Sequence, residues 1–197
     1  LILGGIFAFA GCPLTIIAQT ASTAEPTTVT KGKPYKENWA NTKVILKKKI
    51  WTVEDKNNDN NTWEDLDAGA PAYNGANATV NADDWLVSPP LHLIAGQTYA
   101  LEAGAVVGGH SGTGQRMNIA YGTGDDPTTY NEIVPTTPIS GTAFGTPTTI
   151  KTTFTPTETG DYRIGFHAVS DRPGYIIMRP VKVEEAAETS GTPIAIS

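Results

Sequence analysis

The sequence predicts an all-β fold, a β-sandwich of two sheets, and three observations carry this prediction. Thr, Gly and Pro are abundant, with 20 Gly and 14 Pro among 197 residues, and only 17% of the residues are charged. That composition is typical of many short strands joined by turns. Several stretches alternate apolar and polar residues with the period of two of a half-buried strand. Stretches with the helical period are almost absent, and no helical crossover separates the strands.

The most informative stretch is residues 81–93, which read NADDWLVSPPLHL. Proline has no N–H to donate to a strand ladder and keeps the residue before it out of the helical region. Ser88-Pro89-Pro90 therefore ends one strand at a corner and starts the next. Trp85, in the first of these strands, is expected to be a core residue, and so is Phe166.

The other strands follow in order, separated by turns rich in Gly, Asn, Asp and Pro. The predicted strands cover residues 44–53, 63–66, 70–73, 97–107, 116–121, 148–155, 162–168 and 175–183. Residues 128–149 contain Thr, Pro and Gly with scattered apolar residues, and no strand is predicted there. The basic run Lys47-Lys48-Lys49 is interpreted as a solvated strand or loop edge, where lysine also hinders aggregation. The sum is about ten strands, which suits two packed sheets.

Three ordered motifs resemble a known family. They are WTVEDKNNDNNTW at residues 51–63, DDWLVSPPLHLIAGQTY at residues 83–99 and GDYRIGFHA at residues 160–168. The chain resembles, over roughly residues 34–185, the choice-of-anchor J domain, a relative of the cleaved-adhesin domains of bacterial (Bacteroidetes-type) surface proteins. The resemblance implies a jelly-roll form of the sandwich and an adhesin-like binding role.

The amino terminus carries an apolar run over residues 1–18 that is interrupted by Gly and Pro and is shorter than a spanning helix. Residues 1–21 are therefore predicted to be a secretory or lipoprotein signal that lacks its start. Ala10-Gly11-Cys12 resembles the end of a lipobox, which would make Cys12 a lipid anchor; ordinary cleavage around residues 18–21 is the alternative. A Thr-rich spacer is predicted over residues 22–33, the domain over 34–185 and a linker to a further module over 186–197. The domain itself has no cysteine, so no disulfide holds it.

A metal site is predicted in the loop that follows the first Trp-containing motif. The loop places oxygen-bearing side chains at alternate positions: Asp55, Asn57, Asp59 and Asn61. Such a loop can curl around a hard cation such as calcium, and Asp84 is a candidate for one more carboxylate. Asn60 stands where such loops usually have Gly, and Asn tolerates the left-handed conformation this position needs. A solvated Asn/Asp turn is the alternative; the family resemblance supports the calcium interpretation.

No catalytic set is predicted. Asp83 and Asp84 are adjacent on a strand and should point to opposite faces, so they are not an acid–base pair. The histidines have no metal-ligand spacing, and no nucleophile elbow or phosphate-binding loop is present. Large aromatic residues are usually buried, but Tyr73, Tyr130 and Tyr175 lie near turns and are the candidates for ligand contact.

The function predicted from these features is that of a non-catalytic, exported binding module at the bacterial surface or in the medium. Its expected partners are a glycan or an extracellular protein. The net charge of −6 disfavours a nucleic-acid partner, and membrane contact is expected only through a lipid at Cys12. Two alternatives stay open: a structural spacer that presents a neighbouring module, and an accessory domain of a secreted hydrolase.

Overall fold

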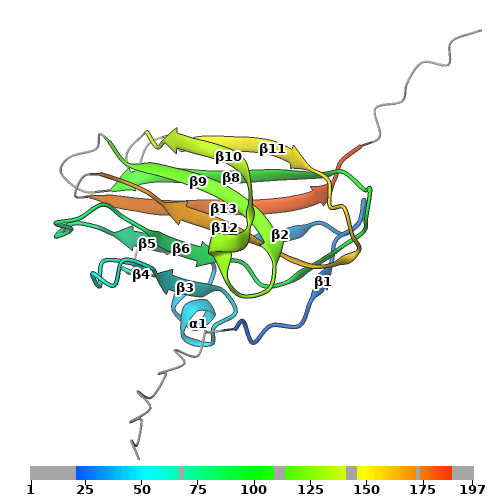
Figure 1. Ribbon diagram of the computed structural model, residues 1–197, viewed down its shortest axis with the longest axis horizontal. Coiled ribbons are helices and arrows are strands. Elements are labelled where there is room, and N and C mark those ends of the chain that lie inside the picture. The colour runs from blue at the N-terminus through cyan, green and yellow to red at the C-terminus, as the bar shows by residue number, and fades with distance from the viewer. Residues whose placement is uncertain (1–20, 67–68, 109–113, 141–145, 172–173, 188–197) are drawn as a thin grey trace, which may run out of the picture.

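A computed structural model describes residues 21–66, 69–108, 114–140, 146–171 and 174–187. Within these ranges, thirteen strands form two sheets that pack face to face, which confirms the predicted two-sheet sandwich (Figure 1). The predicted signal, with Cys12, lies outside the described residues, and so does most of the predicted linker over 186–197.

The seven-stranded sheet is built around one long strand that pairs on both sides. Its strands are β1 (Thr27–Thr28), β3 (Thr52–Asp55), β6 (Asp84–Val87), β7 (Leu91–Leu93), β9 (Arg116–Thr123), β10 (Asn131–Pro138) and β12 (Gly160–Ala168). The order is β1-β7-β12-β6-β3, and β9 pairs with both β12 and β10. β10 falls in the stretch where no strand was predicted. Two register shifts interrupt its pairing with β9, and they explain why its alternation is hard to see.

The six-stranded sheet contains three long strands side by side. Its members are β2 (Tyr35–Glu37), β4 (Trp63–Asp65), β5 (Pro71–Asn74), β8 (Tyr99–Gly108), β11 (Thr148–Phe154) and β13 (Tyr175–Glu185). The order is β11-β8-β13-β5-β4, and β2 pairs with β13. A register shift between Met178 and Val181 accommodates Pro180, whose missing N–H cannot join the ladder.

The Ser88-Pro89-Pro90 corner explains how two short strands share one long partner. β12 pairs with β7 at Gly160–Tyr162 and with β6 at Gly165–Ala168. Between these two pairings the Ser88 backbone N–H donates to the Ile164 carbonyl at 2.9 Å, and the Ile164 N–H donates to Ser88 Oγ at 2.9 Å. The corner therefore replaces the missing ladder bonds while the chain changes direction.

The core lies between the sheets and follows the predicted alternation. Leu86, Phe166 and Ile119 stand side by side on β6, β12 and β9, and none is measurably exposed. Leu101 and Val183 form a matching pair on β8 and β13. Burial of such side chains, at about 1.5–3 kcal/mol each, is the main source of stability.

The strand predicted over residues 44–53 is wrong in its first half, because Thr42–Lys47 forms the helix α1. Thr42 and Ile45 are three residues apart, so both face the interior on one side of a helical turn. Lys47 in the last turn also suits the negative end of the helix dipole. Local sequence favoured a strand through Val44 and Ile45, and packing of Ile45 into the core overrides that preference.

The folded part begins earlier than the predicted domain boundary at residue 34. β1, at Thr27–Thr28, adds to the edge of β7 in parallel, and Val29 is buried in the main core. The predicted spacer thus supplies an edge strand and a core residue.

Candidate functional site

The Asp/Asn loop folds back on its own backbone. Asp55 accepts hydrogen bonds from the N–H of Asp59 at 3.3 Å and of Asn60 at 2.9 Å, and Asp59 accepts one from the N–H of Asn61 at 2.8 Å. Asn58 and Asn60 have φ values of 55° and 62°. The left-handed conformation predicted for Asn60 is therefore confirmed, and it lets the loop curl so that its carboxylates converge.

Asp84 completes a cluster with this loop. One oxygen from each of Asp55, Asp59 and Asp84 lies within 4.8 Å of the others. β3 and β6 are adjacent, and their register places Asp55 directly opposite Asp84. Asp84 is fully buried, with Oδ2 accepting the Asp83 backbone N–H at 3.1 Å. Asp84 Oδ1 and Asp59 Oδ2 are buried without a hydrogen-bond partner among the described residues.

The electrostatics of this cluster favour a bound cation. Burial raises the pKa of Asp84 to about 7, and the charges of Asp55 and Asp59 add to the rise, while the hydrogen bond from the Asp83 N–H opposes it. Unpaired buried carboxylate oxygens are costly, and a hard divalent cation binds such oxygens readily. The donor set formed by Asp55, Asp59 and Asp84 fits calcium on these grounds.

The two asparagines of the predicted ligand set hydrogen-bond to the backbone in and beside the loop. The Asn57 side chain donates to the Asn81 carbonyl at 2.8 Å, and its oxygen accepts the Asp59 N–H at 3.3 Å. The Asn61 side-chain amide donates to the Asp59 carbonyl at 3.2 Å. Both asparagines shape the loop in this structure. The sequence pattern therefore indicated the Asp/Asn loop, whereas the burial of Asp84 beside it depends on the pairing of β3 with β6.

Asp83 and Asp84 point to opposite faces, as predicted for neighbours on a strand. Asp83 bonds His167 Nε2 at 2.7 Å on the outer face of the seven-stranded sheet. The His167 ring stacks on Trp85 at 4.0 Å, and burial lowers the pKa of His167. Trp85 is buried as predicted, but in a small outer cluster with Val87 and Ala120.

The three tyrosines proposed as ligand contacts do not form one platform. Tyr73 is only 1% exposed and packs edge-on against Trp63 in the core, so its prediction as a ligand contact does not fit its position. Tyr130 is half-buried over Gly122, edge-on to Trp85, and its hydroxyl donates to the Gly124 carbonyl at 2.8 Å. Tyr175 is half-buried on the other sheet, at the start of β13.

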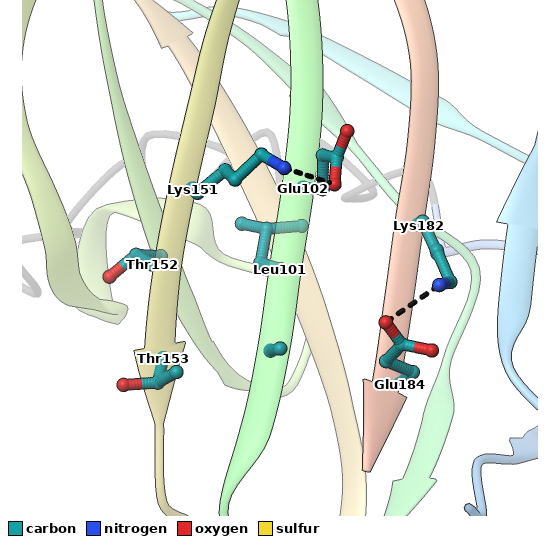
Figure 2. A pocket seen from close by; sticks show the side chains of 8 residues that line it. Leu101, Glu102, Lys151, Thr152, Thr153, Lys182 and Glu184 are labelled. Atoms are coloured by element: carbon teal, nitrogen blue, oxygen red, sulfur yellow. Dashed lines mark ion pairs between the residues drawn. The ribbon is translucent and has the colours of Figure 1, made fainter. Parts of the chain in front are cut away.

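A groove on the outer face of the six-stranded sheet was not found from the sequence. It has a volume of about 560 Å³. Figure 2 shows the side chains that line it along β11, β8 and β13. They are Ala100, Leu101, Glu102, Lys151, Thr152, Thr153, Lys182 and Glu184.

Strand register explains the shape of this groove. Lys151, Glu102 and Lys182 stand in one row across β11, β8 and β13, and Thr153, Ala100 and Glu184 stand in the next. The small Ala100 on the central strand leaves the second row hollow in its middle. The alternation of outward polar residues along these strands was the available signal, but only the pairing shows that they meet.

Ion pairs line the groove and hold its charged side chains in place. Lys151 Nζ lies 3.0 Å from Glu102 Oε2, and Lys182 Nζ lies 2.6 Å from Glu184 Oε1 (Figure 2). A second hollow of about 390 Å³ shares Glu102 and Lys182 and extends towards Lys36 on β2. The two hollows form a polar surface that crosses several strands and offers both donors and acceptors.

Within the described ranges, no helix is long and apolar enough to cross a bilayer.

Comparison with known proteins gives likenesses in structure alone. No family model matches the chain, and no curated protein sequence matches it. The K1 cleaved adhesin domain of Lys-gingipain from Porphyromonas gingivalis is 18% identical with a TM-score of 0.59, over 78% of this chain and 99% of that domain. The K2 cleaved adhesin domain of Lys-gingipain is 12% identical with a TM-score of 0.61, over 79% of this chain and 99% of that domain. A CBM4 domain is 16% identical with a TM-score of 0.50, over 80% of this chain and 97% of that domain.

Sequence identities this low do not indicate a shared function. The structural similarity shows a shared fold. The chain is a two-sheet β-sandwich with the architecture of cleaved adhesin domains.

Proposed function

We propose that this chain is a non-catalytic extracellular binding module that holds a polar ligand in the groove on the outer face of β11, β8 and β13. The single observation behind this proposal is the groove, a hollow lined by paired Lys and Glu side chains on three adjacent strands of the sheet. Sites built on sheet strands keep their geometry better than sites on loops. The names of the structural neighbours, adhesin domains and a carbohydrate-binding module, support the same class of function.

The chemistry of the groove favours a glycan. Hydroxyl groups of a sugar chain both donate and accept, and the rows of Lys, Glu and Thr provide both kinds of partner. An extended segment of an extracellular protein is the second candidate, because the groove crosses the strands and continues into the hollow beside Lys36. We also propose that the chain is a member of the choice-of-anchor J family, because its three sequence motifs resemble that family.

We propose calcium as a structural ion at Asp55, Asp59 and Asp84. When bound, it neutralises carboxylates that otherwise repel one another in a buried place. The cluster joins the loop after β3 to the start of β6, so an ion there stabilises the sandwich edge.

The first experiment is a binding screen of the chain against glycans and extracellular matrix proteins, in calcium and in chelator. Binding in calcium supports the module. A folded protein that binds nothing in either buffer would favour the alternative of a structural spacer. Hydrolysis of a bound glycan would contradict the non-catalytic assignment.

A substitution within the groove gives a sharper prediction. Ala100→Trp fills the hollow between Thr153 and Glu184, so it is expected to weaken ligand binding by more than about tenfold. Ala100 is half-exposed on the outer face, so the melting temperature should change little. The matched control is Thr149→Trp, which adds the same ring on the same face of β11 outside the groove. Isothermal titration with the glycan found in the screen measures both. Equal affinities of the two variants would remove the groove as the site.

A further inference from the structure

Four exposed lysines gather at one edge of an otherwise acidic protein. The lysine patch consists of Lys43, Lys47, Lys48 and Lys49, on α1 and just after it. None of the four forms an ion pair with another described residue, unlike Lys151 and Lys182. The chain as a whole has a net charge of −6, so this concentration of positive charge is local.

Aliphatic side chains accompany the lysines. Val44 is 44% exposed on the same helix, and Leu66 is 38% exposed after β4, which α1 contacts. Thr42 and Ile45 turn inward, so the remaining face of α1 presents Lys43, Val44 and Lys47 to solvent. A surface that combines lysines with exposed aliphatic groups is suited to the boundary between lipid headgroups and acyl chains.

The described chain starts next to this patch. The Ser22 hydroxyl donates to the Ile50 carbonyl at 2.8 Å, and the Thr23 N–H donates to the Lys49 carbonyl at 3.0 Å. The residues that precede them in the sequence include the apolar run of residues 1–18. Figure 1 shows α1 close to this start and at the edge opposite β10 and β11. A membrane segment or lipid at the amino terminus would thus join the domain at the lysine patch.

We propose that the lysine patch is a contact surface for an anionic lipid bilayer, which orients the sandwich with α1 towards the membrane and β10 and β11 away from it. Lysines near an anionic bilayer each contribute about 1 kcal/mol, or about a fivefold change in affinity. This contact is separate from ligand binding in the groove. It also does not depend on which signal residues are removed, because all four lysines lie in the folded part.

Vesicle sedimentation tests this contact with a chain of residues 21–187. The main core cluster lies entirely between Val29 and Val183, so this chain contains the complete core. The vesicles are phosphatidylcholine alone and an equimolar mixture of phosphatidylglycerol and phosphatidylcholine. We expect binding to the anionic vesicles only, weakened by salt. The triple variant Lys43→Gln, Lys47→Gln and Lys48→Gln should lose affinity on the order of 100-fold.

The matched control removes three other exposed lysines, with the variant Lys31→Gln, Lys33→Gln and Lys36→Gln. Both triple variants change the net charge equally, and thermal unfolding checks that both are folded. The proposal requires the control to stay close to the unmodified chain. An equal loss in both variants would show a general charge effect and overturn it. A chain that does not bind anionic vesicles would also overturn the proposal. If such a chain binds soluble dextran sulfate instead, the lysine patch is a site for acidic polysaccharide.

Discussion

Calcium is expected to raise the melting temperature of the unmodified chain, and Asp84→Asn is expected to abolish this response. At a calcium concentration 100-fold above Kd, a bound ion stabilises the folded state by about 2.7 kcal/mol, which corresponds to roughly 5–10 °C for a domain of this size. Asp84 is the buried member of the carboxylate cluster, and one of its oxygens has no hydrogen-bond partner among the described residues. Scanning calorimetry in calcium and in chelator measures the effect.

The same variant should behave differently once calcium is removed. In chelator at pH 8 the buried Asp84 carboxylate has no cation to offset it, whereas an Asn amide can donate to Asp55 and Asp59. Asp84→Asn is therefore expected to be more stable than the unmodified chain by roughly 2–4 kcal/mol in chelator.

Asp83→Asn is the matched control for this experiment. It makes the same change of charge one position away, but its side chain lies on the outer face, bonded to His167. This variant should keep the full calcium response. If both variants lose the response, the effect reflects charge near the loop and not coordination by Asp84. If neither does, Asp84 does not coordinate the ion; if the unmodified chain itself shows no response, the calcium site is absent.

The second large effect is the pH dependence of the calcium-free protein. The pKa of Asp84 is about 7 in the folded state, against 3.8 as its ordinary value. Between these values the folded chain holds a proton that the unfolded chain has released, so the free energy of unfolding falls as pH rises through this window. The whole difference corresponds to roughly 4 kcal/mol, lost progressively from about pH 4 to about pH 7.

Comparison with Asp84→Asn isolates this contribution. His167 has a lowered pKa and acts in the opposite direction, because it favours the folded state as pH rises. Since His167 is present in both proteins, the difference between their unfolding free energies reports Asp84. In chelator, the advantage of Asp84→Asn should shrink as pH falls from 8 to 4, measured by urea unfolding. A difference that stays constant with pH would mean that Asp84 titrates normally.

The sequence resemblance and the structural comparison indicate the same fold. The sequence motifs at residues 51–63, 83–99 and 160–168 resemble a family of surface domains. The structure matches cleaved adhesin domains over nearly their whole length. Export and a lipid at Cys12 stay predictions from the sequence, and mass spectrometry of the mature amino terminus tests both.

Much of the strand pattern could be predicted because it depends on neighbours in sequence. Alternation placed β8 and β12, and the prolines after Ser88 placed the corner between β6 and β7. The alternating Asp/Asn positions located the carboxylate loop, and the left-handed Asn60 followed from the conformational preference of Asn.

Other features depend on partners that are distant in the chain. Val44 and Ile45 suggest a strand, but burial of Ile45 makes α1 a helix. β10 has a weak pattern and forms because β9 offers it an edge. Tyr73 lies near a turn, yet Trp63 covers it in the core.

By itself, the sequence determined the fold class, the corner at Ser88 and the place of the Asp/Asn loop, because periodicity, missing proline N–H groups and turn preferences act within a few residues. Only the tertiary structure decided which side chains meet. The pairing of β3 with β6 buries Asp84 against Asp55, and the register of β11, β8 and β13 assembles the groove around Ala100. The fold of α1 and the residues after it brings the lysine patch beside Ser22 and Thr23. Contacts of this kind are set by strand pairing across long loops, where no local signal specifies the partner.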